Sequence, residues 1–84
     1  MKRIRLSQHA REQCDERGAT EEEVSETIRR GVHEPAKHSR WICRANFQYD
    51  REWHGQHYAI KQVAAVIAEE PEEIVIVTVY TFYF

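Results

Sequence analysis

Apolar and polar residues alternate along one long segment of the chain. From Arg40 to Tyr49, aromatic and small apolar residues occupy every second position, and mostly polar residues lie between them. A period of two predicts a β-strand with one buried face. The mixed composition of its other face indicates contact with solvent or with a ligand.

Three further segments have the composition of strands. Residues 2–6 alternate between apolar and basic side chains and predict a short, half-buried strand. Residues 57–68 begin with an alternation of polar and apolar residues. Val63–Ala68 has an equal propensity for a helix, but we predict a strand because the turn at residues 69–73 leads directly into another strand. Residues 74–80 are nearly all β-branched, so we expect this strand to be buried on both faces and to lie centrally.

Two helices are predicted between the first strand and residue 31. The first covers residues 7–17, with Ser7 as its N-cap and Gly18 as the residue that ends it. The second begins with a capping box formed by Thr20 and Glu23, and it runs to about Arg30.

The remaining residues are predicted to form connections. Gly31 ends the second helix, and we expect Pro35 to lie in a loop beyond it. Residues 50–56, which include Gly55, are expected to form a turn. The order β-α-α-β-β-β predicts one α+β domain over residues 1–84, with two helices packed on one face of a mainly antiparallel sheet.

The composition indicates in which cellular compartment the protein is expected. The longest apolar run, residues 74–84, is too short for a membrane helix, and no apolar signal segment follows the basic start. The two cysteines do not form a CxxC pair, so a disulfide framework is not expected. We therefore expect a cytoplasmic protein that does not bind a membrane.

Charge argues against a protein that coats nucleic acid by electrostatics alone, because the formal net charge is −2. The charged residues are distributed unevenly along the chain, however. Residues 1–44 contain ten lysines and arginines against eight acidic residues, whereas residues 45–84 contain two against six. A local basic patch on an otherwise acidic protein is compatible with this pattern, as are ordinary solvated faces.

The first helix carries the most suggestive side chains, His9 in its first turn and Arg17 in its last. Histidine titrates near neutral pH, and the arginine fork matches the geometry of a phosphate. Helical geometry separates the two by about 80° around the axis and roughly 12 Å along it. They can border one cleft, but they reach the same atom only if Arg17 folds back.

Several short motifs together resemble a small bacterial family of unknown function. The motifs are a Ser-x-His-Ala start, Glu-Arg-Gly, Thr-x-Glu-Glu-Val, Lys-Gln-Val and Val-Thr-Val-Tyr, found at Ser7–Ala10, Glu16–Gly18, Thr20–Val24, Lys61–Val63 and Val77–Tyr80. The predicted order of elements also resembles the RelE/ParE and BrnT toxins of bacterial toxin–antitoxin systems. Relatives with this pattern often have an arginine where this chain has Gln13.

The resemblance to these toxins implies a metal-independent endoribonuclease that acts on mRNA and is covered by an antitoxin protein. Such a reaction needs an acid, a base and fixed cations at one phosphate. The candidate catalytic residues are then His9, Arg17, Lys61 and Tyr80. The candidate RNA-binding residues are Arg5, Arg11, Arg44 and Trp53.

Each candidate also has a purely structural explanation. His9 can bond a neighbouring loop, Arg17 suits the negative end of a helix, and Lys61 can be a solvated strand residue. No cofactor or metal is expected, because the histidine pairs lack the four well-spaced ligands of a structural zinc site. The alternative function is a non-catalytic interaction module, with a homodimer formed through the aromatic C-terminal strand.

Overall fold

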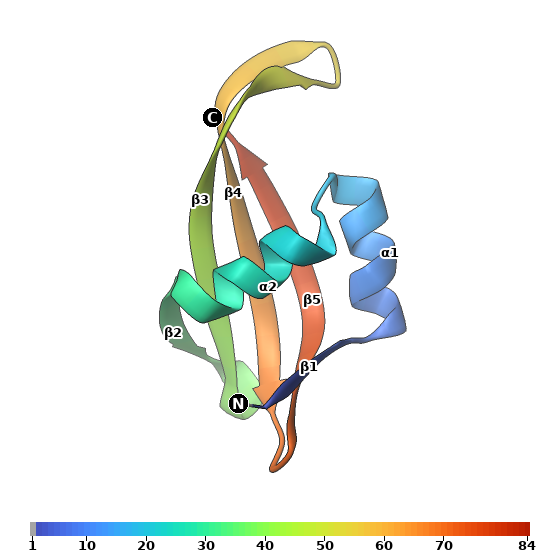
Figure 1. The fold of residues 1–84 in the computed structure, drawn as a ribbon, viewed down its shortest axis with the longest axis vertical. Coiled ribbons are helices and arrows are strands. Elements are labelled where there is room, and N and C mark those ends of the chain that lie inside the picture. Colours follow the sequence, from blue (N-terminus) through green and yellow to red (C-terminus); the bar gives the residue numbers. More distant parts are fainter. Residues whose placement is uncertain (1) are drawn as a thin grey trace.

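The computed structural model describes residues 2–84, which form two α-helices, one short 3₁₀-helix (η1, Lys37–Ser39) and five strands (Figure 1). The elements are β1 (Arg3–Leu6), α1 (Gln8–Arg17), α2 (Glu21–Arg30), β2 (Val32–Ala36), β3 (Arg40–Trp53), β4 (Gln56–Glu69) and β5 (Glu73–Tyr83). The sheet has the order β1-β5-β4-β3-β2, and of these pairs only β1–β5 is parallel. The predicted α+β class and mainly antiparallel sheet are confirmed.

Both helices begin as their sequences predict. Ser7 Oγ accepts a hydrogen bond from the Ala10 N–H at 3.1 Å, and Gly18 ends α1 with a φ of 76°. In α2, Thr20 Oγ1 accepts from the Glu23 N–H, and Glu23 Oε1 accepts from the Thr20 N–H, each at 3.0 Å. The capping box is therefore confirmed. No helix within residues 2–84 is long and apolar enough to span a membrane.

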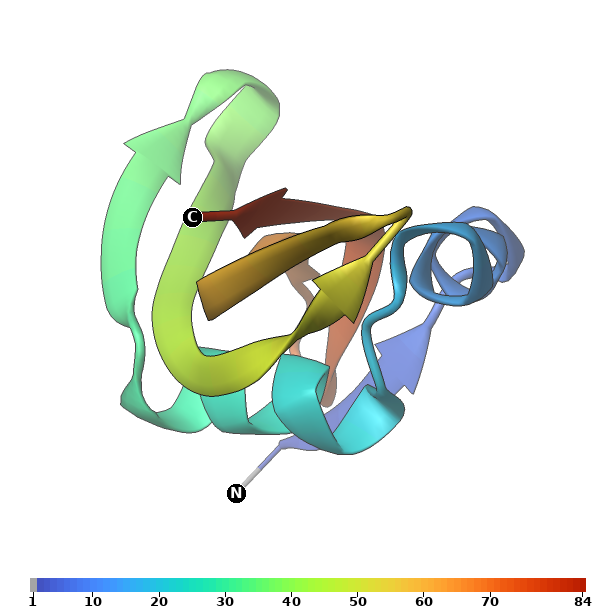
Figure 2. The same ribbon diagram turned by 90° about the horizontal axis from the view of Figure 1, so that it is seen from above.

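The hydrophobic core lies between the helices and one face of the sheet. Helix α2 crosses this face over β3 and β4, whereas α1 lies beside β5 (Figures 1 and 2). Val24 and Ile28 of α2 pack with buried sheet residues such as Val63 and Ile76. Burial of each such side chain contributes about 1.5–3 kcal/mol, so this packing fixes the helices on one face.

The expectation that residues 74–80 are buried on both faces is wrong. Strand β5 lies inside the sheet, but β4 is the central strand, and within residues 74–80 only Ile76 and Val79 are buried. The reason is that both helices cover the same face. The β-branched sequence therefore reflects strand propensity and one packed face.

The segment after α2 also differs from expectation. Residues 32–36 form the short edge strand β2, paired antiparallel with β3, and not a loop. Pro35 is tolerated there because an edge strand has one side without a ladder partner. His38 and Ser39 have φ values of 62° and 58° in the tight corner that reverses the chain into β3.

The connection between β3 and β4 is shorter than the predicted turn. Only His54 and Gly55 lie outside the strands, and their φ values of 51° and 84° are typical of a two-residue type I′ hairpin. A bulge at Asp50, where the pairing shifts between Gln48 and Arg51, bends the hairpin. Its tip curls over the end of the molecule where α1 meets α2 (Figures 1 and 2).

Candidate nucleic-acid interface

Within residues 2–84, one face of the sheet carries no helix, and we call it the open face. Two neighbouring rows of cross-strand partners define it: Arg44, Ala64 and Tyr80 in one row, and Asn46, Gln62 and Phe82 in the next. Cross-strand partners point to the same side of a sheet, and successive rows alternate. The row of Cys43, Ala65 and Val79, which is adjacent to that of Arg44, Ala64 and Tyr80, is fully buried under the helices, so the open face is the opposite one.

Two aromatic rings stand side by side on the open face. Tyr80 and Phe82 are each 43% exposed, and their ring centroids are 6.5 Å apart with an interplanar angle of 23°. Phe84, two residues further along, is 63% exposed. Aromatic residues at every second position of one strand give a row of exposed rings, which is a suitable surface for stacking of flat ligands.

Arg17 of α1 joins this aromatic pair from the edge of the sheet. Its guanidinium carbon lies 5.1 Å from the centroid of the Tyr80 ring, and its Nη1 donates a hydrogen bond to the Val79 carbonyl at 2.6 Å. The guanidinium group has five N–H donors, and a cation over an aromatic face is attracted by the ring. Arg17 thus places a fixed positive charge, with donors to spare, at the margin of the open face.

The neighbouring part of α1 replaces a missing strand at this edge. Strand β1 pairs only with Glu73–Ile76, so the next part of β5 has no described strand on its outer edge. The buried Gln13 side chain accepts the Val79 N–H at 2.7 Å, and the Ser7 N–H donates to the Ile76 carbonyl at 3.0 Å. An arginine at position 13 has no acceptor atom, so it does not replace this contact.

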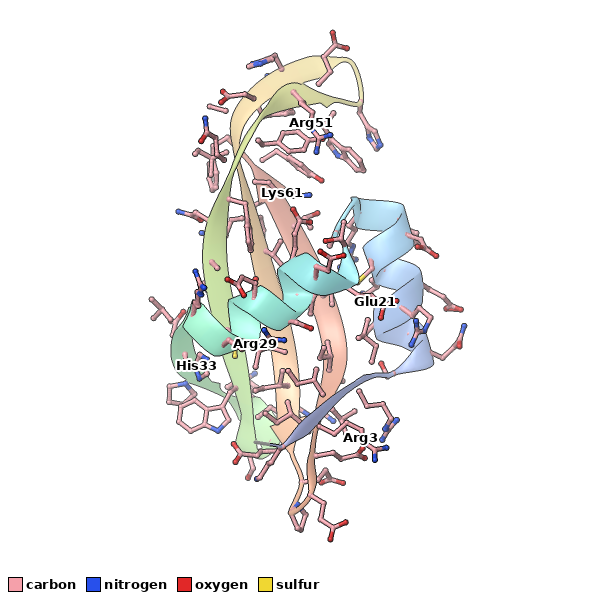
Figure 3. All side chains as sticks on the ribbon, viewed as in Figure 1. Arg3, Glu21, Arg29, His33, Arg51 and Lys61 are labelled. Carbon is pink, nitrogen blue, oxygen red and sulfur yellow. The ribbon has the colours of Figure 1, made fainter. Side chains whose placement is uncertain are left out.

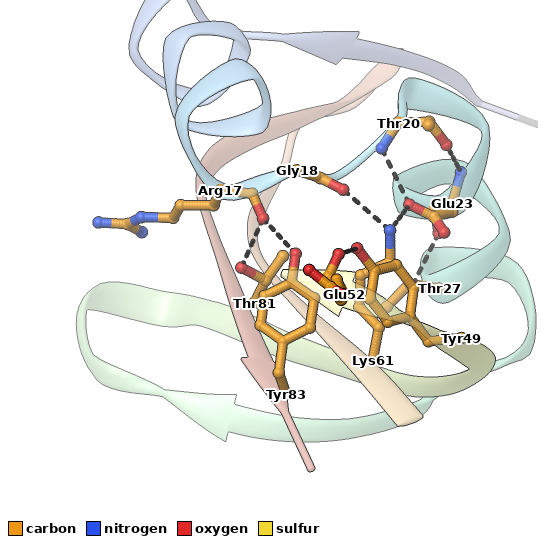
Figure 4. Close-up of polar contacts among 10 residues, drawn as sticks. All are labelled: Arg17, Gly18, Thr20, Glu23, Thr27, Tyr49, Glu52, Lys61, Thr81 and Tyr83. Atoms are coloured by element: carbon orange, nitrogen blue, oxygen red, sulfur yellow. Dashed lines mark hydrogen bonds and ion pairs between the residues drawn. The ribbon is translucent and has the colours of Figure 1, made fainter. Parts of the chain in front are cut away.

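The end of α1 is held by side chains of β5. The Arg17 carbonyl accepts hydrogen bonds from Thr81 Oγ1 at 2.9 Å and from the Tyr83 hydroxyl at 2.7 Å (Figure 4). Carbonyls in the last turn of a helix lack helical partners, and these two donors satisfy one of them. The main chain of Arg17 is therefore fixed to β5, which orients its side chain toward Tyr80.

Lys61 lies on the opposite, helix-covered face and is 3% exposed. Its Nζ donates to the Gly18 carbonyl at 2.8 Å and pairs with Glu23 Oε1 at 2.8 Å (Figure 4). The ammonium group also lies 5.2 Å from the centroid of the Tyr49 ring. All three of its N–H donors thus have nearby partners, and Lys61 connects the α1–α2 loop to the sheet.

The predicted base-stacking residue Trp53 also lies on the helix side. Its ring stacks on Tyr83 at 5.0 Å and on His54 at 4.3 Å, and it packs against Gly18. A Cβ atom at Gly18 would lie 2.6 Å from the Trp53 ring, so only glycine allows this close approach. The structure therefore does not bring Trp53 to Tyr80 and Arg17.

The three predicted RNA-binding arginines lie on two different surfaces. Arg5 and Arg44 point to the same side of the sheet as Tyr80, whereas Arg11 lies on the outer side of α1. Each pairs with a carboxylate in an exposed ion pair, and these pairs are Arg5–Glu73 at 3.0 Å, Arg44–Glu34 at 3.0 Å and Arg11–Glu21 at 2.8 Å. Hydrogen bonding to Arg5 lowers the pKa of the Glu73 carboxyl group.

His9 is exposed and lies one helical turn before Gln13 on α1. Helical geometry places it roughly 12 Å along the axis from Arg17 and about 80° around it. Among the four candidate catalytic residues, the structure therefore brings together Arg17 and Tyr80, whereas His9 lies near the start of α1 and Lys61 on the other face of the sheet.

Other chemistry is limited in the described part of the chain. Burial raises the pKa of the Cys43 thiol to about 11 and also raises that of Cys14, so both are thiols at neutral pH and not reactive thiolates. No three His, Cys, Asp or Glu side chains within residues 2–84 gather closely enough to hold a metal ion.

Phe82 is a surface residue that the candidate list from the sequence lacks. The sequence does show an alternating pattern there, since Tyr80, Phe82 and Phe84 alternate with Thr81 and Tyr83. The sequence did not reveal which set faces the helices. Burial resolves this, because Thr81 and Tyr83 bond to α1 while Phe82 remains exposed.

Comparison with known proteins yields one informative match. Neither the curated proteins nor the solved structures give a significant match to the chain. A protein family does match, over residues 6–81, which is nearly the whole chain. In agreement with the family of unknown function that the motifs suggested, the chain belongs to the family described as domain of unknown function DUF4258.

Proposed function

We propose that this protein is a toxin-type, RNA-acting protein that binds single-stranded RNA on its open face. The observation that carries the proposal is the exposed Tyr80–Phe82 pair with the Arg17 guanidinium against the Tyr80 ring. Aromatic side chains on an antiparallel sheet are a common platform for unstacked RNA bases, and a neighbouring arginine contacts the backbone phosphate.

The rest of the open face supports the same proposal. Asn46 and Gln62 lie in the row of Phe82, and Gln62 Nε2 donates to Asn46 Oδ1 at 2.9 Å. Amide side chains of this kind can hydrogen-bond to the edges of splayed bases. Because the net charge is −2, we expect stacking to dominate and few phosphates to be contacted.

Cleavage of mRNA without a metal is the further part of the proposal. It requires proton transfer and charge stabilisation at one phosphate. The Arg17 guanidinium lies over the Tyr80 ring, so we assign cleavage to Arg17 and to the hydroxyl group that this ring carries. His9 is roughly 12 Å further along α1 and therefore contacts a neighbouring nucleotide. A cytoplasmic antitoxin that covers the open face would block the activity.

Binding is tested by fluorescence anisotropy with a labelled single-stranded RNA of about twelve nucleotides. We expect Tyr80→Ala and Phe82→Ala each to weaken binding about fivefold or more, because stacking of one base contributes about 1–3 kcal/mol. The matched control is Trp41→Ala, which removes a similarly exposed aromatic ring, 39% exposed, from outside the open face. Equal losses in all three variants, or no binding by the wild type, would contradict the proposal.

Cleavage is tested with the same RNA in the presence of a chelator. We expect wild-type cleavage to be lost in Arg17→Ala and Tyr80→Phe, and to be reduced in His9→Ala. Tyr80→Phe retains the stacking surface, so RNA binding should survive while cleavage does not. Cleavage that persists in both Arg17→Ala and Tyr80→Phe would overturn the catalytic assignment and leave the binding assignment intact.

A second candidate function is a protein interface on the same face. The exposed rings at Tyr80, Phe82 and Phe84 favour it, since contiguous exposed apolar side chains mark interaction sites. Light scattering after size-exclusion chromatography distinguishes the two. A dimer that dissociates in Phe82→Ala, without RNA binding by the wild type, would favour the interaction module.

A further inference from the structure

A cavity of about 560 Å³ opens on the helix-covered side of the sheet, at the end away from the curled hairpin. Its lining contains four isoleucines, one tryptophan and four residues with polar or charged ends: Ile4, Ile28, Ile67, Ile74, Trp41, Lys2, Arg29, His33 and Glu69. Small-molecule sites usually have volumes of about 300–1,000 Å³ and a mainly apolar lining with a few placed polar groups.

The cavity exists because the helix layer is shorter than the sheet. Helix α2 has ten residues and spans about 15 Å, whereas β3 and β4 have fourteen residues each and span about 45 Å. Beyond Arg30, no α-helix of the described chain, residues 2–84, lies above this face of the sheet. Ile67, 2% exposed, forms the floor there, and the partly exposed Trp41 forms a wall.

Positive charge dominates the rim. On one side Lys2 pairs with Glu69 at 2.8 Å, so these two charges neutralise each other. On the other side Arg29 and His33 lie together at the end of α2 (Figure 3). The His33 Nε2 lies 2.8 Å from the Ile28 carbonyl, which fixes the imidazole ring. Arg29 forms no ion pair within residues 2–84, so its charge is available to a ligand.

We propose that this cavity binds a small amphipathic carboxylate, with its apolar body against the isoleucines and Trp41 and its carboxylate paired with Arg29. The combination of an apolar floor with one unpaired guanidinium is complementary to such a molecule, because arginine binds carboxylates in a bidentate geometry. The site is separate from the open face, so it does not depend on RNA binding.

The probe for the test is decanoate, kept below its micelle concentration, and the readout is the indole N–H resonance of Trp41. We expect decanoate to shift this resonance saturably and to leave the indole resonance of Trp53 unchanged. Decyltrimethylammonium, which has the same tail and the opposite charge, should bind at least tenfold more weakly. Each methylene removed from the carboxylate should weaken binding about fourfold, because each buried methylene contributes about 0.8 kcal/mol.

Two exposed arginines at the end of α2 give a matched pair of variants. Arg29→Ala should weaken decanoate about fivefold to tenfold, since it removes the charged partner. Arg30→Ala removes a neighbouring arginine that pairs with Glu26 and does not line the cavity, so affinity should not change. Absence of a saturable shift, equal binding of the cationic probe, or equal effects of the two variants would each overturn the proposal.

Discussion

A basic side chain lies at each face of this sheet, and the two side chains have different roles. Lys61 and Arg17 both act at the end of α1, since Lys61 bonds the Gly18 carbonyl while the adjacent Arg17 reaches β5. The ammonium group of Lys61 is buried and fully occupied by Gly18, Glu23 and Tyr49. Within residues 2–84, the guanidinium of Arg17 forms one hydrogen bond, to the Val79 carbonyl, and it lies over the exposed Tyr80 ring. Surroundings, and not residue type, distinguish a structural cation from one that can bind a ligand.

The largest loss of stability is expected from a substitution on the helix-covered face. Lys61→Ala should lower the free energy of unfolding by about 2–3 kcal/mol, because it leaves the partly buried Glu23 carboxylate without its partner. Arg30→Ala, which removes an exposed pair with Glu26, should cost at most about 0.5 kcal/mol. Urea denaturation measures both, and similar values for the two variants would show that Lys61 is not structural.

Glycine substitutions test the packing of the curled hairpin against α1. Gly18→Ala should cost about 2–3 kcal/mol, because the position combines a positive φ with a Cβ only 2.6 Å from the Trp53 ring. Gly55 also has a positive φ, but apart from its chain neighbours no atom of residues 2–84 lies within 4 Å of a Cβ added there, so Gly55→Ala should cost about 1 kcal/mol. The difference between the two melting temperatures reports the contact with Trp53, and equal values would contradict it.

The edge of β5 gives a smaller effect. Gln13→Ala leaves the Val79 N–H without its acceptor and should cost about 1–2 kcal/mol. Gln13→Arg should be no better, since arginine has no acceptor. Hydrogen exchange at the Val79 amide should accelerate in both variants, while the Ile76 carbonyl contact with Ser7 remains. Unchanged protection at Val79 would show that the Gln13 contact is dispensable.

Alkaline pH perturbs the covered face without a substitution, and its effect is absent at neutral pH. Burial raises the pKa of the Cys43 thiol from 9.0 to about 11 in the folded protein. Its contribution to stability is therefore fully present below about pH 9 and is lost as the pH rises toward 11. The free energy of unfolding should fall less steeply over this range in Cys43→Ala than in the wild type. Parallel pH profiles would contradict the raised pKa.

The sequence predicted those parts of the fold that depend on local chemistry. The capping box of Thr20 and Glu23, the glycine end of α1 and the alternation in β3 all form as expected, because each depends on neighbouring residues. Strand β2 was missed because its residues are mostly exposed and include Pro35, so no alternation marks it. Only its pairing with β3 makes it a strand.

The candidate site was only partly predictable for a related reason. Arg17 and Tyr80 were both identified, yet the sequence did not indicate that they touch each other at the edge of β5. Lys61 has the residue type of a catalytic cation, and its role depends on Glu23, which is 38 positions earlier in the chain. Long-range pairing of this kind is fixed by tertiary packing, which no local pattern reports.

The most direct test of the open face is an NMR titration of the wild-type protein with single-stranded RNA. If RNA binds as proposed, changes in chemical shift should concentrate at Arg17, Tyr80 and Phe82. They should also include the cross-strand neighbours of the two aromatic residues, Ala64 and Gln62. Resonances of the covered face, such as those of Trp41 and Lys61, should remain unchanged. Shifts confined to the covered face, or none at saturating RNA, would contradict the account.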